Sequence, residues 1–229
     1  MVGYHSLFLS AFTSMSNYIL TTPRELRHRM DTLRIYFDTN LVQFGSYMLT
    51  DSIFDDYYIA QPTKNFLTKL GHKEKLRRDF RALRFILDKD DELPFIFTTS
   101  NLTKMELSRI RDPSKRERAL EFYDSLNEYG NPMGWPSPTY VPAKPSQGIL
   151  ERISLILRKN PRFRENDAKH IFQSLIKRCN IFLTSDWKTI LQYQHGLENL
   201  GVNAKSPYQL VIGIYGQELW ERGAGLLLR

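Results

Sequence analysis

Short apolar runs alternate along this chain with segments of helical periodicity, and this alternation is the feature that most limits its fold. The runs at 33–37, 95–98, 181–184 and 201–205 are expected to be strands, and 139–141 a short edge strand closed by Pro142. Strands that alternate with helices form a parallel sheet, because each parallel crossover needs a helix-length connection. The sequence therefore predicts an α/β fold with a central parallel sheet between helical layers.

The helices are expected from apolar periodicity and from capping residues. Gly71 is expected to bend or split one long helix, and residues 112–114 to interrupt another. Ser100 or Asn101 is expected to cap the helix that carries Glu106, and Asn166 the helix that carries Asp167. The remaining helices are predicted at 39–48, 61–87, 115–126, 146–159, 187–200 and 207–220.

Four acids far apart in the chain lie where a strand ends or on the helix that follows: Asp38, Glu106, Asp167 and Asp186. Residues at the carboxyl ends of strands in an open α/β sheet converge above one edge of the sheet. Four carboxylates gathered there repel one another unless a hard cation neutralises them, and Mg²⁺ or Mn²⁺ prefers such oxygen ligands. The pattern indicates a metal-dependent phosphodiesterase.

Each of these residues also has a purely structural interpretation. Asp38, Asp167 and Asp186 each stand where an acid commonly caps a helix, so capping alone accounts for their positions. A Glu on a helix is usually a solvated charge, which is the plain interpretation of Glu106. His170, one turn after Asp167, is more often a packing residue than part of a site.

The residues around these acids resemble the PIN-domain family of metal-dependent nucleases, whose members include VapC-like toxin ribonucleases. The resemblance rests on FDTN at 37–40, TTSNLTKMEL at 98–107, NDAKHIFQSLI at 166–176 and FLTSD at 182–186, and it covers about residues 30–215. It implies a three-layer α/β/α fold, cleavage of RNA, and Mg²⁺ or Mn²⁺ held by Asp38, Glu106, Asp167 and Asp186. Thr39, Asn40, Thr184, Ser185 and His170 would support these acids. In VapC-like relatives a partner antitoxin blocks the site.

The chain departs from the family pattern in three places. Family members often carry a further acid soon after the last Asp, whereas Lys188 and Thr189 stand there in this chain. The helical section at 51–93 and the loop at 127–147 are both longer than usual. These differences bear on the range of substrates more than on the chemistry.

A net charge of +7 suits a polyanionic partner such as RNA. Basic residues flank two of the acids, and Arg109, Arg111, Arg162 and Arg164 are therefore expected to contact phosphates. Another basic stripe, Arg77, Arg81 and Arg84, lies in the lengthened section and is expected to matter less. For any one of these groups, a solvated helix face is the simpler explanation.

The remaining features set broad limits. The single Cys179 excludes an internal disulfide and fits the reducing cytoplasm, and no apolar run is long enough to cross a membrane. The nuclease domain is expected at 30–229. Residues 1–29 are expected to be an extension, either a loosely held helix or a contact in a homodimer, or else the product of a start codon placed too early.

Two other functional classes stay open. One is a PIN-type module that has lost catalysis and only binds RNA or protein, although the presence of all four acids argues against it. The other is a haloacid-dehalogenase-like phosphatase, which also begins with an Asp after a strand. Such enzymes need a second acid two residues later, where this chain has Asn40.

Overall fold

The structure is a computed structural model that describes residues 32–48, 61–71, 73–88, 95–128, 145–146 and 148–217. In this part of the chain, four parallel strands form one sheet in the order β2-β1-β3-β4. The strands are β1 (Leu33–Phe37), β2 (Phe95–Thr98), β3 (Ile181–Leu183) and β4 (Ala204–Lys205). The predicted α/β fold with a central parallel sheet is confirmed. The predicted edge strand at 139–141 and the extension at 1–29 lie outside the described residues.

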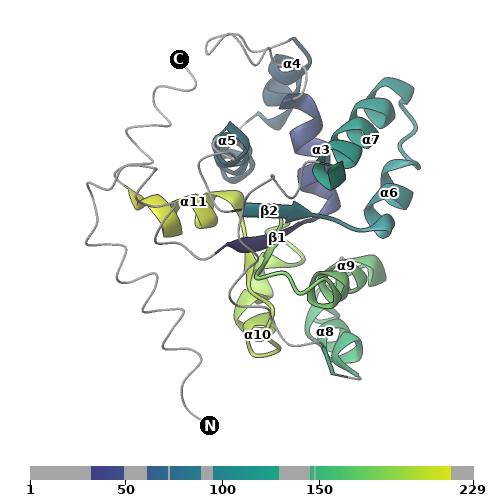
Figure 1. Ribbon diagram of the computed structural model, residues 1–229, viewed down its shortest axis with the longest axis vertical. Coiled ribbons are helices and arrows are strands. Elements are labelled where there is room, and N and C mark those ends of the chain that lie inside the picture. The colour runs from purple at the N-terminus through teal and green to yellow at the C-terminus, as the bar shows by residue number, and fades with distance from the viewer. Residues whose placement is uncertain are drawn as a thin grey trace.

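Helices cover both faces of the sheet, so that the described chain has three layers (Figure 1). On one face lie α3 (Thr39–Met48), α5 (Glu74–Asp88), α7 (Pro113–Glu128) and α11 (Pro207–Tyr215), while α4 (Gln61–Leu70) packs against α3 and α5. On the other face lie α8 (Ile149–Leu157), α9 (Glu165–Ile176) and α10 (Gln194–Glu198). The short helix α6 (Asn101–Leu107) follows β2 and packs on α3 and α7.

Alternation along the central strand divides the core into two halves. Ile35 and Phe37 point into the cluster under α3, α5, α7 and α11, whereas Tyr36 points into the cluster under α8 and α9. Phe182 of β3 joins Tyr36 on the second face, and their rings stack with centroids 5.5 Å apart. All three of these β1 side chains are fully buried, as strands of a parallel sheet covered on both faces require. No helix among the described residues has the length and apolar character to cross a membrane.

As predicted, Gly71 splits the segment 61–87 into α4 and α5, because it adopts a positive φ of 51° that ends α4. Other local details differ from the sequence predictions. Pro113 does not interrupt a helix but begins α7, where Asp112 Oδ1 accepts a hydrogen bond from the Lys115 amide at 3.1 Å. Asn166 is not a cap, since α9 begins at Glu165 after the extended Arg164.

The continuous helix predicted at 187–200 is wrong. Residues 187–190 form turns, a 3₁₀ turn η1 (Leu191–Tyr193) follows, and only α10 is α-helical. The carbonyl of Lys188 explains the difference. In a helix it would accept from the backbone amide of Gln192, but here it accepts from the side-chain amides of Asn160 and Gln192. Side chains that compete for backbone partners in this way are a known cause of broken helices.

Candidate functional site

The two central strands each deliver polar side chains to the same edge of the sheet. Asp38 directly follows β1, and its amide donates to the carbonyl of Leu183, the last residue of β3, at 3.0 Å. Thr184, Ser185 and Asp186 follow β3 at once. Because β1 and β3 are parallel neighbours, their carboxyl ends bring Asp38 beside Thr184. The site is therefore built on the middle of the sheet.

The carboxylate of Asp38 is buried and fully hydrogen-bonded. Its Oδ1 accepts from the Thr39 amide at 2.8 Å, and its Oδ2 accepts from Asn40 Nδ2 at 2.9 Å and from Thr184 Oγ1 at 2.7 Å. Asn40 is held in turn, since its Oδ1 accepts from the Ser185 amide at 3.2 Å. The four predicted supporting residues Thr39, Asn40, Thr184 and Ser185 thus all lie around Asp38 and fix its orientation.

Burial raises the pKa of Asp38, and the negative charge of Asp186 raises it further. The charge of His170 and the hydrogen bond from Thr184 act in the opposite direction but do not cancel the effect of burial. The ionised carboxylate is therefore costly in this position. A cation close to Asp38 would offset that cost.

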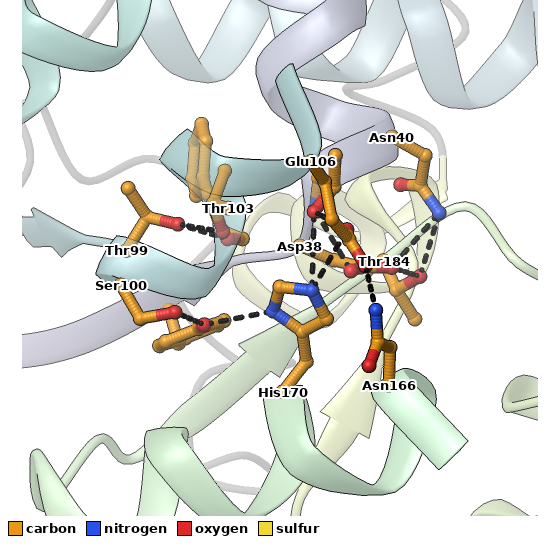
Figure 2. A network of polar contacts seen from close by, with 12 residues as sticks. Asp38, Asn40, Thr99, Ser100, Thr103, Glu106, Asn166, His170 and Thr184 are labelled. Atoms are coloured by element: carbon orange, nitrogen blue, oxygen red, sulfur yellow. Dashed lines mark hydrogen bonds and ion pairs between the residues drawn. The ribbon is translucent and has the colours of Figure 1, made fainter. Parts of the chain in front are cut away.

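Glu106 reaches the same place from α6 and pairs with His170 of α9. The Glu106 Oε2 atom lies 2.9 Å from His170 Nε2 and accepts a hydrogen bond from Thr39 Oγ1 at 2.6 Å (Figure 2). Its other oxygen accepts from Asn166 Nδ2 at 2.7 Å. Burial alone would raise the pKa of Glu106, but the hydrogen bonds from His170 and Thr39 outweigh it and lower the pKa to about 2. Glu106 is thus an ionised acid held by three side chains, not a solvated helix charge.

His170 is the buried centre of a chain of polar contacts. Its Nδ1 atom lies 3.0 Å from the Tyr36 hydroxyl, which donates to Ser100 Oγ at 2.6 Å (Figure 2). With that hydroxyl donating to Ser100, a protonated imidazole satisfies both of its ring contacts by donating to Tyr36 and to Glu106. Burial lowers the pKa of His170, but the hydrogen bond to Glu106 and the charges of Asp38 and Glu106 raise it overall. His170 therefore supplies positive charge among the acids.

Asp167 lies in the first turn of α9 and has two roles at once. Its Oδ2 accepts from the Arg164 amide at 3.2 Å, so the capping interpretation holds. Burial raises the pKa of Asp167 to about 6, although the Arg164 hydrogen bond lowers it, and the charges of Asp38 and Asp186 raise it further. The pKa of an acid that merely capped an exposed helix end would not be raised by two other carboxylates. Asp167 therefore belongs to the same electrostatic cluster.

Asp186 shows the strongest capping geometry of the four acids. Its Oδ1 accepts from the amides of Lys188 at 3.0 Å and Thr189 at 2.8 Å, and its Oδ2 accepts from the Thr189 hydroxyl. The carboxylate thus closes the turn after β3. Its charge nevertheless acts on both Asp38 and Asp167. Thr189 thus holds the Asp186 carboxylate through both its amide and its hydroxyl.

The structure therefore brings all four predicted acids and His170 into one region, through direct contacts or through mutual electrostatic effects. Their carboxylates are paired with neighbouring donors in this arrangement. Within the described ranges, no three side chains of His, Cys, Asp or Glu are grouped so that they could hold one metal ion. The oxygen-rich donor set fits a hard divalent cation in kind.

The predicted phosphate contacts lie on the segments that lead into these acids. Arg162 and Arg164 are exposed in the connection between α8 and α9, directly before Asp167. Arg109 and Arg111 are exposed just after α6, which carries Glu106. The stripe on α5 differs, since Arg77 is exposed but Arg81 and Arg84 are half-buried.

Three polar residues of this region escaped the sequence analysis. Tyr36 alternates with apolar neighbours on β1, so it was indistinguishable from a core residue. Asn166 was interpreted as a helix cap, but its side chain holds Glu106. Asp79 of α5 is fully buried and accepts a hydrogen bond from Trp187 Nε1 at 2.6 Å. Trp187 directly follows Asp186 in the sequence. The spacing of Asp79 from Leu76 and Leu83 places it on the apolar face of α5, and that signal could have identified it.

Comparisons of this chain with protein-family models, with curated proteins and with solved structures gave no match.

Proposed function

We propose that this protein is a PIN-like, divalent-metal-dependent endoribonuclease that hydrolyses phosphodiester bonds of RNA at the edge of the sheet beside Asp38. The observation that carries the proposal is the buried Asp38 at the end of β1, whose carboxylate is close enough to Asp186 and Asp167 for their negative charges to affect one another. Carboxylates that repel one another in this way favour a hard cation as ligand. The motif resemblance and the net charge of +7 favour RNA as the substrate.

In this proposal Asp38, Glu106, Asp167 and Asp186 hold one or two Mg²⁺ or Mn²⁺ ions. Such an ion, when bound, lowers the pKa of a water molecule and stabilises charge on the phosphate. Asn40 and Thr184 keep the Asp38 carboxylate in a fixed orientation, and His170 does the same for Glu106. Groups that orient ligands in this way commonly tune a metal site. Arg162 and Arg164 would bind the flanking phosphates.

By the same resemblance, an antitoxin protein that covers the site is proposed as a partner, and the cytoplasm as the location.

One observation favours the alternative of a binding module that has lost catalysis. The carboxylates of Asp186 and Asp38 each accept three hydrogen bonds from donors of the chain itself. Metal binding would have to compete with these donors, which is easiest at Asp167, where the described residues supply one amide at 3.2 Å. An activity assay decides between the two functions.

The decisive experiment measures cleavage of a labelled RNA in Mg²⁺, in Mn²⁺ and in EDTA. We expect metal-dependent cleavage by the wild type and none by Asp38→Asn, which keeps the size of the side chain but removes its charge. Asp124→Asn, an exposed acid on α7, is the matched control and should cleave like the wild type. A generic phosphatase substrate is assayed alongside.

Metal binding is measured separately as the shift of the melting temperature on adding Mg²⁺ or Mn²⁺. A ligand that binds only the folded state raises this temperature. The shift should be present in the wild type and strongly reduced in Asp38→Asn. Undiminished cleavage by purified Asp38→Asn would place catalysis at another site. RNA binding by the wild type without any cleavage would support the alternative, a binding module that has lost catalysis.

A further inference from the structure

A pocket of about 400 Å³ lies between the segment that leads into α9 and the turn that follows Asp186, and the proposed function uses only its Arg162. One wall is formed by residues 160–162, which lead into α9 and Asp167. The other wall is formed by Trp187 and Lys188, directly after Asp186, with Gln192 and Tyr193 of η1. The pocket is shallow and largely open to solvent, so it can hold a group against its surface but does not enclose one.

One hydrogen bond joins the two walls, and two others fix the shape of each wall. The buried Asn160 donates through Nδ2 to the carbonyl of Lys188 on the opposite wall. Its Oδ1 accepts from the Arg162 amide at 2.8 Å, which fixes the turn that carries Arg162. Gln192 donates to the same Lys188 carbonyl. The broken helix at 187–200 is thus what forms this wall.

The lining combines positive charge with aromatic rings. Arg162 and Lys188 are both exposed and have no acidic partner among the described residues, and the lining contains no acid. The half-buried rings of Trp187 and Tyr193 also line the pocket. A third cation contacts Trp187, because Lys75 Nζ lies over its ring, 4.8 Å from the centroid. Phosphates bind to such cations, and unpaired bases stack on such rings.

We propose that this pocket binds one nucleotide of a single-stranded RNA, with its base against Tyr193 and Trp187 and its phosphate on Arg162 and Lys188. The inference rests on the proposed ribonuclease function, since it names the form of RNA that enters that site. Bases inside a duplex are stacked on one another and have no free face for the rings of Trp187 and Tyr193. The pocket therefore makes the protein selective for single-stranded or looped RNA near the cleaved bond.

The test measures binding of a fluorescent six-nucleotide oligouridylate by anisotropy in EDTA, where metal-dependent cleavage does not occur. Tyr193→Leu keeps an apolar side chain but removes the ring, and Tyr193→Phe keeps the ring. We expect Tyr193→Leu to bind at least about fivefold more weakly, at the lower end of what loss of one base–aromatic stack produces. Tyr193→Phe should bind within about twofold of the wild type, since only the hydroxyl is lost.

A second pair of variants tests the positive charge of the pocket, and it remains informative if Tyr193→Leu unfolds. Arg162→Gln should weaken binding and lower the slope of log affinity against log salt by roughly 0.7, the value for one phosphate contact on a single strand. Lys159→Gln, an exposed neighbour outside the lining, is the control and should bind like the wild type. An RNA duplex long enough to stay paired in the assay should bind more weakly than the single strand.

The outcomes separate the pocket from the catalytic proposal. Oligouridylate binding that depends on Tyr193 and Arg162, without any cleavage in metal, supports the pocket and removes the ribonuclease function. Metal-dependent cleavage together with wild-type binding by both Tyr193→Leu and Arg162→Gln overturns the pocket alone. Preference for the duplex, or equal losses in Tyr193→Leu and Tyr193→Phe, also overturns it.

Discussion

Asp167 is the acid whose titration reports most directly on the crowding of charge at this site. Its pKa is raised to about 6 from an ordinary value of 3.8, so the folded state keeps the proton over a range where the unfolded chain has lost it. The unfolded state therefore binds fewer protons between these two values, and the free energy of unfolding falls as pH rises through that window. Above about pH 6 the full penalty of the ionised group is present.

Asp167→Asn should remove this pH-dependent loss, because the amide cannot ionise and its oxygen can still accept from the Arg164 amide. Measured by urea unfolding in EDTA, the stability of the variant relative to the wild type should increase from about pH 4 to about pH 7. Glu165→Gln, an exposed acid on the same helix, is the control. A stability difference that stays constant over this range would show that burial and the neighbouring charges do not raise the pKa of Asp167.

At the scale of elements, Asp79 connects α5 to two segments at the site edge. Besides Trp187 Nε1, it accepts from the amide of Tyr208 in α11 at 3.4 Å. Asp79→Ala should lower the free energy of unfolding by about 1–3 kcal/mol, since it removes a buried acceptor from these two partly buried donors. Urea unfolding of Asp79→Ala, Trp187→Phe and the double variant measures the coupling. Strictly additive losses would contradict a direct connection between α5 and the turn after β3.

The packing of α3 on α7 depends on a glycine. A Cβ atom on Gly45 would stand 2.2 Å from ring atoms of the buried Phe122. Alanine favours a helix over glycine by about 1 kcal/mol, but overpacking of a core costs about 1–3 kcal/mol, so Gly45→Ala should be destabilising or at best neutral. Adding Phe122→Leu should restore part of the lost stability, measured as the melting temperature in thermal unfolding. Clear stabilisation by Gly45→Ala alone would show that the two helices separate easily.

The elements themselves were largely predictable, whereas their contacts were not. The strands at 33–37 and 95–98 and the break at Gly71 follow from local apolar runs and from backbone freedom, which a sequence displays directly. The failure at 187–200 arose because Asn160, distant in the sequence, captures the Lys188 carbonyl. The acids were found as candidates because they follow predicted strands. Tyr36 was not, since its role is defined by partners that only the folded chain brings near, whereas the place of Asp79 on the apolar face of α5 is a signal that the sequence does carry.

At the scale of the whole molecule, the strand order explains why the acids meet where they do. The chain leaves β1 for β2 on one side and later returns to place β3 on the other side, so the direction of winding reverses between β1 and β3. Ligands of open α/β sheets bind at such a switch point, outside the carboxyl ends of the strands. Asp38 and Asp186 follow the two strands that flank it. The topology therefore supports a binding site at this edge independently of any motif.

The same geometry predicts which basic residues bind RNA. Arg109 and Arg111 follow the helix that brings Glu106 to the switch point, whereas Arg77 lies on α5, which covers one face of the sheet. The double variant Arg109→Gln/Arg111→Gln should therefore weaken RNA binding about equally for all sequences, and it should lower the salt slope by roughly 1.4, or 0.7 for each phosphate contact. Arg77→Gln, an exposed arginine, is the control and should change neither quantity by much. Binding is measured by anisotropy in EDTA at several salt concentrations. A larger loss in Arg77→Gln than in the double variant would move the RNA-binding surface from the sheet edge to the helical face.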